Sequence, residues 1–172
     1  KPVPDALLQQ AFELARMGPT SGNCQPLRIL FVRGAEAKKK FEPCLSEGNR
    51  AKTMAAPATA IFAMDMEFYE LMPRLFHDPT ARSWFAGKPA AIEETAFRNS
   101  SLQAAYFILA CRSLGLDCGP MSGFNNEAVD AAFFADTPKV KSNFISTLGY
   151  GDPASIFERS PRPDFERFNR IA

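Results

Sequence analysis

Few side chains in this sequence could carry out catalysis unaided. His77 is the only histidine, and it lies in a loop-like run with no nucleophile elbow around a candidate serine. A Ser-His-Asp or Cys-His site would have to be built on this one residue. The sequence also lacks a glycine-rich phosphate loop and a dinucleotide fingerprint. A protein of this kind either does no chemistry or takes its reactivity from a bound cofactor.

The four cysteines are scattered along the chain, at positions 24, 44, 111 and 118. None forms a Cys-x-x-Cys pair, which argues against a zinc ribbon or a thioredoxin-type pair. Zinc ligation by one histidine and dispersed thiols is not expected either, so we predict no metal site. Thiols without a signal peptide are typical of reduced, cytoplasmic proteins. Cys24 is expected to be a small packed residue, and a thiol-based redox protein remains an alternative.

Two short segments are better candidates for binding a cofactor. Small polar side chains such as Ser21 and Asn23 can hydrogen-bond the edge of a ring with little loss of conformational entropy. Either segment alone is explained equally well as a capped helix end or a turn. The residues that we single out are Pro19, Thr20, Ser21, Asn23 and Gln25 in the first segment, and Pro120, Met121, Ser122 and Gly123 in the second.

The elements that must position these segments follow from hydrophobic periodicity and turn signals. Helices and strands are mixed without regular alternation, which favours an α+β fold. A Pro- and Arg-rich tail from Asp152 onward is expected to lie extended along a surface. We predict helices over residues 5–15, 35–45, 51–54, 89–114 and 126–135, strands over 27–33, 58–64 and 142–148, and a turn over 120–123.

Length and composition limit the possible functions. The 172 residues fit one domain, with 46% hydrophobic and 23% charged residues as in ordinary soluble proteins. The formal net charge of +1 gives no footprint for nucleic acid, and no apolar run is long enough to span a membrane. The middle of the predicted helix 89–114 is apolar nearly all round, which indicates burial against a second subunit. Because the chain opens with Lys1, we expect the natural N-terminus to lie upstream.

In their order and spacing, the motifs resemble those of the nitroreductase family. Segment 19–26 is similar to the family's Pro-Ser-x-x-Asn-x-Gln-Pro, with Thr20 where Ser is more common. Residues 120–124 resemble the family turn whose backbone N–H faces N5 of the flavin, which gives Ser122 and Gly123 a catalytic role.

Further positions extend the resemblance over nearly the whole chain. Asn49 is similar to the family Asn near the pyrimidine edge of the flavin, and Arg159 and Arg162 are placed like the family's basic residues at the FMN phosphate. The resemblance implies a single FMN-binding domain over residues 1–172. It also implies a central mixed sheet flanked by helices, and an intertwined homodimer with FMN at the subunit interface.

The activity that the resemblance implies is hydride transfer from NADH or NADPH through flavin N5 to a small acceptor. Residues 81–85, 94–104 and 119–124 look like the malonic semialdehyde reductase branch of pyrimidine degradation, which forms 3-hydroxypropanoate. Arg82 or Arg98 would then face the substrate carboxylate. A broad nitro or quinone reductase and a non-catalytic flavin-binding dimer are the alternatives.

Overall fold

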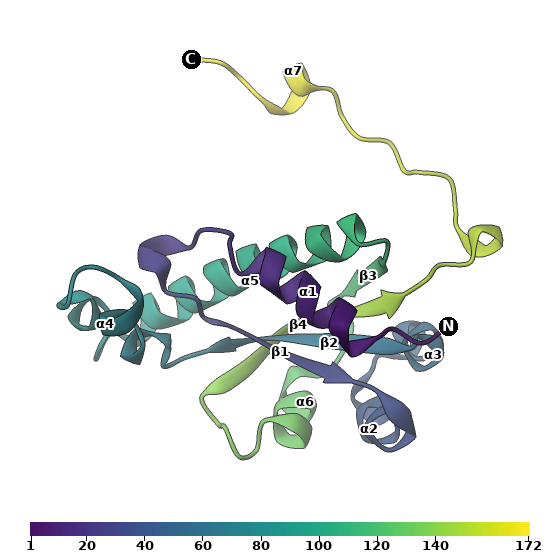
Figure 1. Cartoon of the computed structure of the whole chain (residues 1–172), viewed down its shortest axis with the longest axis horizontal. Coiled ribbons are helices and arrows are strands. Elements are labelled where there is room, and N and C mark those ends of the chain that lie inside the picture. The colour runs from purple at the N-terminus through teal and green to yellow at the C-terminus, as the bar shows by residue number, and fades with distance from the viewer.

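A four-stranded sheet forms the centre of the molecule in the computed structural model, which describes residues 1–172 (Figure 1). The strand order is β1-β2-β4-β3, and every pairing is antiparallel. The strands are β1 (Leu27–Val32), β2 (Ala58–Asp65), β3 (Asp117–Met121) and β4 (Val140–Gly149). The predicted α+β class is confirmed. The predicted mixed sheet is wrong, because every strand pairing within the chain is antiparallel. Helix α5 returns the chain so that β3 runs parallel to β2, yet β4 lies between them and makes both contacts antiparallel.

One face of the sheet is covered by α5 (Pro89–Ser113) and α1 (Asp5–Ala15), which lie above it in Figure 1. Most of the side chains that meet there are apolar, and on α5 they alternate with a few buried polar residues. The apolar side chains include Leu8, Ala11, Phe62, Phe107 and Leu148. This layer forms the larger of the two cores against the sheet.

The other face is covered by α2 (Gly34–Phe41) and α6 (Asn126–Phe133). Helix α3 (Glu47–Ala55) follows α2 and leads into β2, which is buried on both faces from Ala58 to Ala63. Such a strand reads as a continuous apolar run, as the sequence shows. The second core contains Phe41, Ile61, Phe124, Val129 and Ile145.

Two of the element boundaries that differ from the sequence-based prediction bear on the candidate site. Helix α3 begins at Glu47, so Asn49 lies in its first turn and not in a preceding loop. Strand β3 continues through Pro120 and Met121, where the sequence predicts a turn. Proline is tolerated there because β3 is an edge strand, so the missing N–H breaks no ladder.

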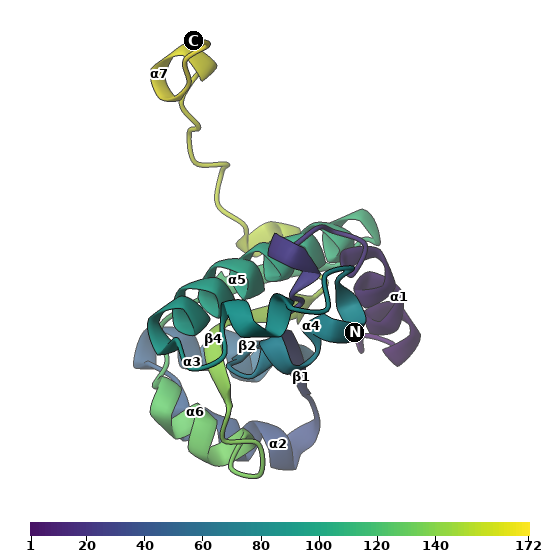
Figure 2. The same ribbon diagram turned by 90° about the vertical axis from the view of Figure 1, so that its left-hand side faces the viewer.

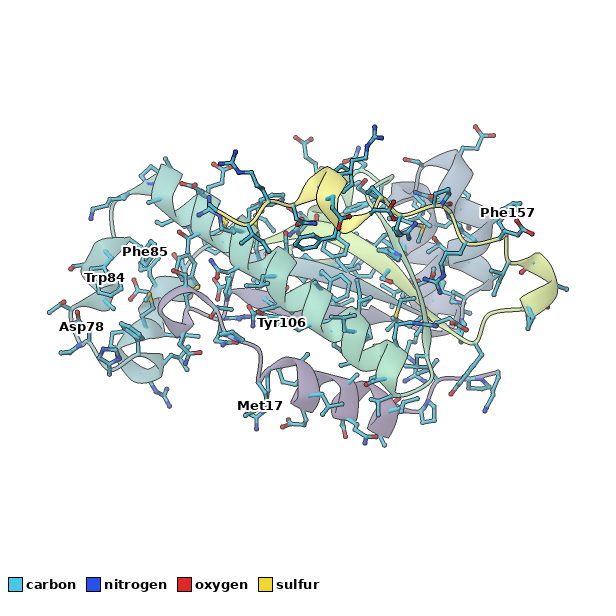
Figure 3. The ribbon with its side chains drawn as sticks, turned by 90° about the horizontal axis from the view of Figure 1, so that it is seen from above. Met17, Asp78, Trp84, Phe85, Tyr106 and Phe157 are labelled. Atoms are coloured by element: carbon cyan, nitrogen blue, oxygen red, sulfur yellow. The ribbon has the colours of Figure 1, made fainter.

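Residues 66–88 form an aromatic lobe at one end of the sheet. The lobe contains η3 (Phe68–Glu70), α4 (Met72–Leu75) and η4 (Ala81–Trp84). Its rings pack edge to face, with centroids 5.0 Å apart for Phe68 and Phe85 and 5.6 Å for Phe76 and Trp84. Trp84 and Phe85 lie at the opposite end of the molecule from Phe157 (Figure 3).

The C-terminal tail leaves the body of the protein. From Tyr150 onward every residue is exposed, including the short turns η5 (Pro153–Ser155) and α7 (Phe165–Phe168), and both views show the tail reaching away from the sheet (Figures 1 and 2). The prediction that the tail lies extended along a surface is therefore wrong for the surface of its own chain. No helix in the structure combines the length and apolar character needed to cross a bilayer.

Candidate functional site

The segment at residues 19–26 is a tight turn with unusual backbone geometry. Its 3-10 turn η1 (Ser21–Asn23) contains left-handed residues, with φ of 54° at Gly22 and 51° at Asn23, and Gln25 follows at 45°. Left-handed backbone is uncommon outside glycine, although Asn adopts it more readily than most residues. Such strained residues cluster at functional sites, where the surrounding structure holds them in place.

Helix α5 holds this segment through a stripe of polar side chains. Asn99 Oδ1 accepts a hydrogen bond from the Ser21 N–H at 2.9 Å. Gln103 Oε1 accepts from the Leu27 N–H at 3.0 Å. The Tyr106 hydroxyl, labelled in Figure 3, donates to the Pro19 carbonyl at 3.1 Å. Positions 99, 103 and 106 recur at helical spacing and so share one face of α5.

Sequence reasoning did not assign Asn99 or Gln103 a role. Both are almost fully buried, with 3% and 6% of their surface exposed. Two large amides on the buried face of a mostly apolar helix are the signal that could have revealed them, because buried polar groups need partners.

The side chains of this segment divide into buried and exposed sets. Ser21 and Asn23 are exposed, whereas Cys24 is completely buried. Burial raises the pKa of the Cys24 thiol to about 11, even though a hydrogen bond with Thr20 acts in the opposite direction. A thiol of this kind is inert at neutral pH, so Cys24 is a packed residue, as expected.

The second segment meets Asn49, so two of the predicted site positions are brought together. Asn49 Nδ2 donates to the Gly123 carbonyl at 3.0 Å, and the Ser46 N–H donates to the same oxygen at 3.1 Å. An ideal Cβ on Gly123 would overlap Asn49 Nδ2. Only glycine therefore permits this close approach of the chain to α3.

The backbone N–H groups of Ser122 and Gly123 donate no hydrogen bond within the chain. Ser122 is exposed and Gly123 is partly exposed, so both groups can be reached from solvent. Backbone N–H groups are strong donors that are nearly always paired in folded proteins. Two successive free donors form a site that suits an acceptor atom or an anion.

A cavity of about 680 Å³ lies between the end of α3, the start of β3 and the end of β4. Lys52, which follows Asn49 by three residues on α3, is the only cationic residue in its lining and forms no salt bridge. Sequence reasoning gave Lys52 no role. Its helical spacing from Asn49 is the signal that could have indicated one.

The two segments lie far apart in one chain. Segment 19–26 leads into β1 and segment 120–124 includes the end of β3, and these strands are the opposite edges of the sheet. Three inter-strand spacings separate them, or about 14 Å. They also lie on opposite faces, since Leu27 packs in the core under α5 while Phe124 packs in the core under α6.

The four candidate arginines are not part of either segment. Arg159 and Arg162 lie on the exposed tail, where Arg162 bonds only to nearby backbone carbonyls. Arg82 forms two hydrogen bonds of 2.7 Å with Glu70, and Arg98 pairs with Glu94. No group of three acidic, His or Cys side chains is arranged to hold a metal ion.

Comparison with known protein families identifies the class to which this fold belongs. Residues 1–150 match the sequence profile of the Nitroreductase family. The chain therefore belongs to the nitroreductase family.

Close relatives and solved structures agree with this assignment. A Burkholderia lata protein named "Putative NADH dehydrogenase/NAD(P)H nitroreductase" is 62% identical over 171 residues, covering 99% of this chain and 87% of that protein. A Stutzerimonas stutzeri protein of the same name is 58% identical over 167 residues, covering 97% and 85%. A Bacillus subtilis nitroreductase-like structure superposes with a TM-score of 0.88 at 21% identity, covering 99% and 89% of the chains. An Exiguobacterium sibiricum structure in complex with FMN gives 0.87 at 19% identity, covering 100% and 89%.

Proposed function

We propose that this chain is an FMN-dependent oxidoreductase that takes hydride from NADH or NADPH and works as an intertwined homodimer. The observation that carries the proposal is the pair of free N–H donors at Ser122 and Gly123, held beside Asn49 by a contact that only glycine allows. The family to which the chain belongs and the FMN complex of the Exiguobacterium sibiricum structure support this choice of cofactor.

The residues present fit the chemistry of FMN. The exposed side chains of Ser21 and Asn23 and the amide of Asn49 provide the neutral donors and acceptors that the edge of a flavin ring requires. Lys52 provides a cation beside Asn49. When bound, FMN supplies hydride acceptance and donation at N5. The backbone N–H of Ser122 or Gly123 would donate a hydrogen bond to that atom without titrating.

The phosphate of FMN calls for charge, which we assign to Arg159 and Arg162. Arginine can meet a phosphate with two parallel hydrogen bonds, and a bond to a charged group is worth about 1.5–3 kcal/mol, against about 0.5–1.5 kcal/mol for a neutral one. The arginines would then dominate affinity, while the ring contacts would tune the chemistry.

A second copy of the chain is needed because the two segments lie at opposite edges of the sheet. One flavin ring can contact both only if each subunit supplies one of them. Helix α5 offers a surface for this contact, since Leu102 and Leu109 lie two turns apart on one face and are 40% and 67% exposed. Exposed apolar side chains gathered on one surface mark protein contacts.

The tail supports the intertwined form of this dimer. Its apolar residues are exposed, with Phe157 at 93%. Strand β1 has an unpaired edge, and a groove of about 730 Å³ runs between β1 and α1, lined by Leu8, Phe12 and Ile29 among others. A tail exchanged between subunits would cover both apolar surfaces at once, and it would carry Arg159 and Arg162 to the partner.

We further propose malonic semialdehyde as the acceptor, on the strength of the motif resemblance over residues 81–85, 94–104 and 119–124. A carboxylate would have to displace Glu70 from Arg82 or Glu94 from Arg98, because both arginines are paired. A broad nitro or quinone reductase is the second candidate. Two observations favour it. Arg82 and Arg98 are already paired with glutamates, and Trp84 is 42% exposed and could stack on a planar acceptor.

The test is to titrate the purified protein with FMN, follow the flavin absorption, and then measure turnover with NADH and with NADPH. Three acceptors are compared: malonic semialdehyde, a nitroaromatic and a quinone. A protein that stays colourless would contradict FMN binding. Uptake of FMN without NAD(P)H oxidation would indicate the non-catalytic dimer instead.

The dimer is tested separately with Leu109→Asp, which places a charge on the exposed face of α5. We expect loss of the dimer in size-exclusion chromatography and loss of FMN affinity together. Ala35→Asp, which puts the same charge at an exposed position on α2, is the matched control. A monomeric Leu109→Asp protein that still binds FMN with unchanged affinity would contradict a shared site.

A further inference from the structure

Three side-chain amides form a continuous chain of hydrogen bonds between α5 and the aromatic lobe. Gln103 Oε1 accepts from the Leu27 N–H at 3.0 Å, and Gln103 Nε2 donates to Gln25 Oε1 at 2.6 Å. Gln25 Nε2 then donates to Asn23 Oδ1 at 2.7 Å, and Asn23 Nδ2 donates to the Leu75 carbonyl at 2.7 Å. We call this chain the amide relay.

The two ends of the amide relay fix its direction. The oxygen and nitrogen ends of an amide side chain are alike in shape, so orientation is decided by hydrogen-bond partners. Here one end is the backbone N–H of Leu27, which can only donate, and the other is the carbonyl of Leu75, which can only accept. Only one orientation of all three amides satisfies both ends.

The buried end of the amide relay holds this orientation most firmly. Gln103 is 6% exposed, and an unsatisfied polar group at such a position costs about 1–3 kcal/mol. At the other end Asn23 is exposed and has left-handed backbone. Its amide keeps one N–H and one oxygen lone pair that the relay does not use.

We propose that Gln103 is a positioning residue that acts through Gln25 and, together with the Leu75 carbonyl, holds the Asn23 amide in the orientation that it presents to the bound flavin. The inference rests on the proposed function, because it takes FMN as the ligand of segment 19–26. It assigns Gln103, which lies 80 positions after Asn23, an effect on the flavin without direct contact. It also gives Gln25 the role of transmitting that effect.

The test compares Gln103→Met and Gln25→Met, which keep the length of the side chain but remove its hydrogen bonds. Ser100→Ala is the control, since Ser100 is fully buried on the same helix and bonds to Phe97 and Asn143 outside the relay. The measurements are the FMN dissociation constant, the visible absorption spectrum of bound FMN and its midpoint potential. Thermal unfolding reports folding separately.

We expect each Met variant to weaken FMN binding up to about tenfold, the effect of one neutral hydrogen bond. Both should shift the flavin spectrum and potential in the same direction, and the double variant should add nothing, because both substitutions cut one chain. Ser100→Ala should leave the spectrum and potential at the wild-type values.

Wild-type spectrum and potential in a folded Gln103→Met protein, or additive effects in the double variant, would overturn the amide relay. If Gln103→Met does not fold, the partly exposed Gln25 carries the test, and a wild-type flavin in Gln25→Met is equally decisive. Failure of the proposed function would be seen differently, because the wild-type protein itself would then take up no FMN. That result would overturn the amide relay as well.

Discussion

The two segments of the candidate site are built in opposite ways. Segment 19–26 has strained backbone and is held by side chains, above all Asn99 and Gln103 of α5. Segment 120–124 begins at the end of an edge strand and is held through the Gly123 carbonyl, which leaves the N–H groups of Ser122 and Gly123 free. The first segment therefore presents side chains and the second presents backbone. We therefore expect side-chain substitutions to have strong effects in segment 19–26 and weak effects in segment 120–124.

The largest difference in FMN affinity is expected between Arg162→Ala in the tail and Ser122→Ala in the second segment. We expect Arg162→Ala to weaken FMN binding by roughly tenfold to a hundredfold, because it removes charge-assisted bonds to the phosphate. Ser122→Ala should change the dissociation constant by less than about twofold, since its contribution comes from the backbone. FMN titration followed by fluorescence provides the comparison. Equal losses in the two variants would contradict the backbone role of the second segment.

A smaller loss is expected from Gly123→Ala, which breaks the backbone-built segment directly. The added methyl overlaps Asn49 Nδ2 and comes within 3.5 Å of Ser46 Oγ, so either the Asn49 side chain or the turn must shift and the hydrogen bond between them is disturbed. Overpacking of this kind costs about 1–3 kcal/mol, and we expect FMN binding to weaken about tenfold.

Gly48→Ala is the matched control for Gly123→Ala. It lies in the first turn of the same helix α3, and a Cβ there meets nothing within 4 Å. The control should bind FMN like the wild type. Similar binding by both glycine variants would show that the contact between Gly123 and Asn49 is not needed.

Gly22→Ala tests the side-chain-built segment. Gly22 has φ of 54°, and its Cβ would lie 3.1 Å from Met72 Cε in the aromatic lobe. We expect a loss of about 1 kcal/mol in unfolding free energy from the backbone alone, and a few-fold weaker FMN binding. Thermal unfolding and FMN titration measure the two effects.

Gly115→Ala separates strain from contact. Gly115 has φ of 81° in the turn between α5 and β3, with nothing within 4 Å of a Cβ. This variant should lose similar stability and keep its FMN affinity. An affinity loss in both variants would mean that global destabilisation explains the effect.

The smallest expected effect concerns the anchor of β3, which leads to the second segment. Asp117 accepts from the Gly151 N–H at 2.6 Å and pairs with Arg112. The Gly151 bond, helped by Arg112, holds the pKa of Asp117 below its ordinary value. Because the folded pKa is lowered, this stabilisation is present above about pH 4 and is lost as the pH falls further. The side chain is half exposed, so the contribution is small.

We therefore expect Asp117→Asn to flatten the acid limb of a plot of melting temperature against pH, below about pH 4. Asp136→Asn, at an exposed position with no hydrogen-bond partner for its side chain, is the control and should follow the wild-type curve. An unchanged acid limb in Asp117→Asn would exclude this carboxylate as an anchor of the second segment.

Much of the fold could be read from local sequence. The apolar run at residues 58–64 predicted the central strand β2, and the long helix over residues 89–114 matches α5 closely. Periodicity succeeds there because burial along one element leaves a regular trace in the residues of that element. The last part of strand β3, Pro120 and Met121, was predicted as a turn, because Pro120 is a turn signal that an edge strand can tolerate.

The candidate site was predicted only in part for a related reason. Its motifs are local, so Ser21, Asn23 and Gly123 could be singled out from the chain alone. Arg82 was predicted as a possible partner of the substrate carboxylate, but it pairs with Glu70 on a different turn of the lobe. The partners of segment 19–26 on α5 are 78 to 87 positions distant. No local pattern reports such contacts.

The amino-acid sequence alone specifies the type of most elements and the order and spacing of the nitroreductase motifs. The tertiary structure decided that the two segments occupy opposite edges of an antiparallel sheet, that α5 holds one of them through Gln103, and that the tail leaves the body. The physical reason is that local preferences fix the conformation of each element. The order of strands and the partners of buried amides depend on how the whole chain packs around one core.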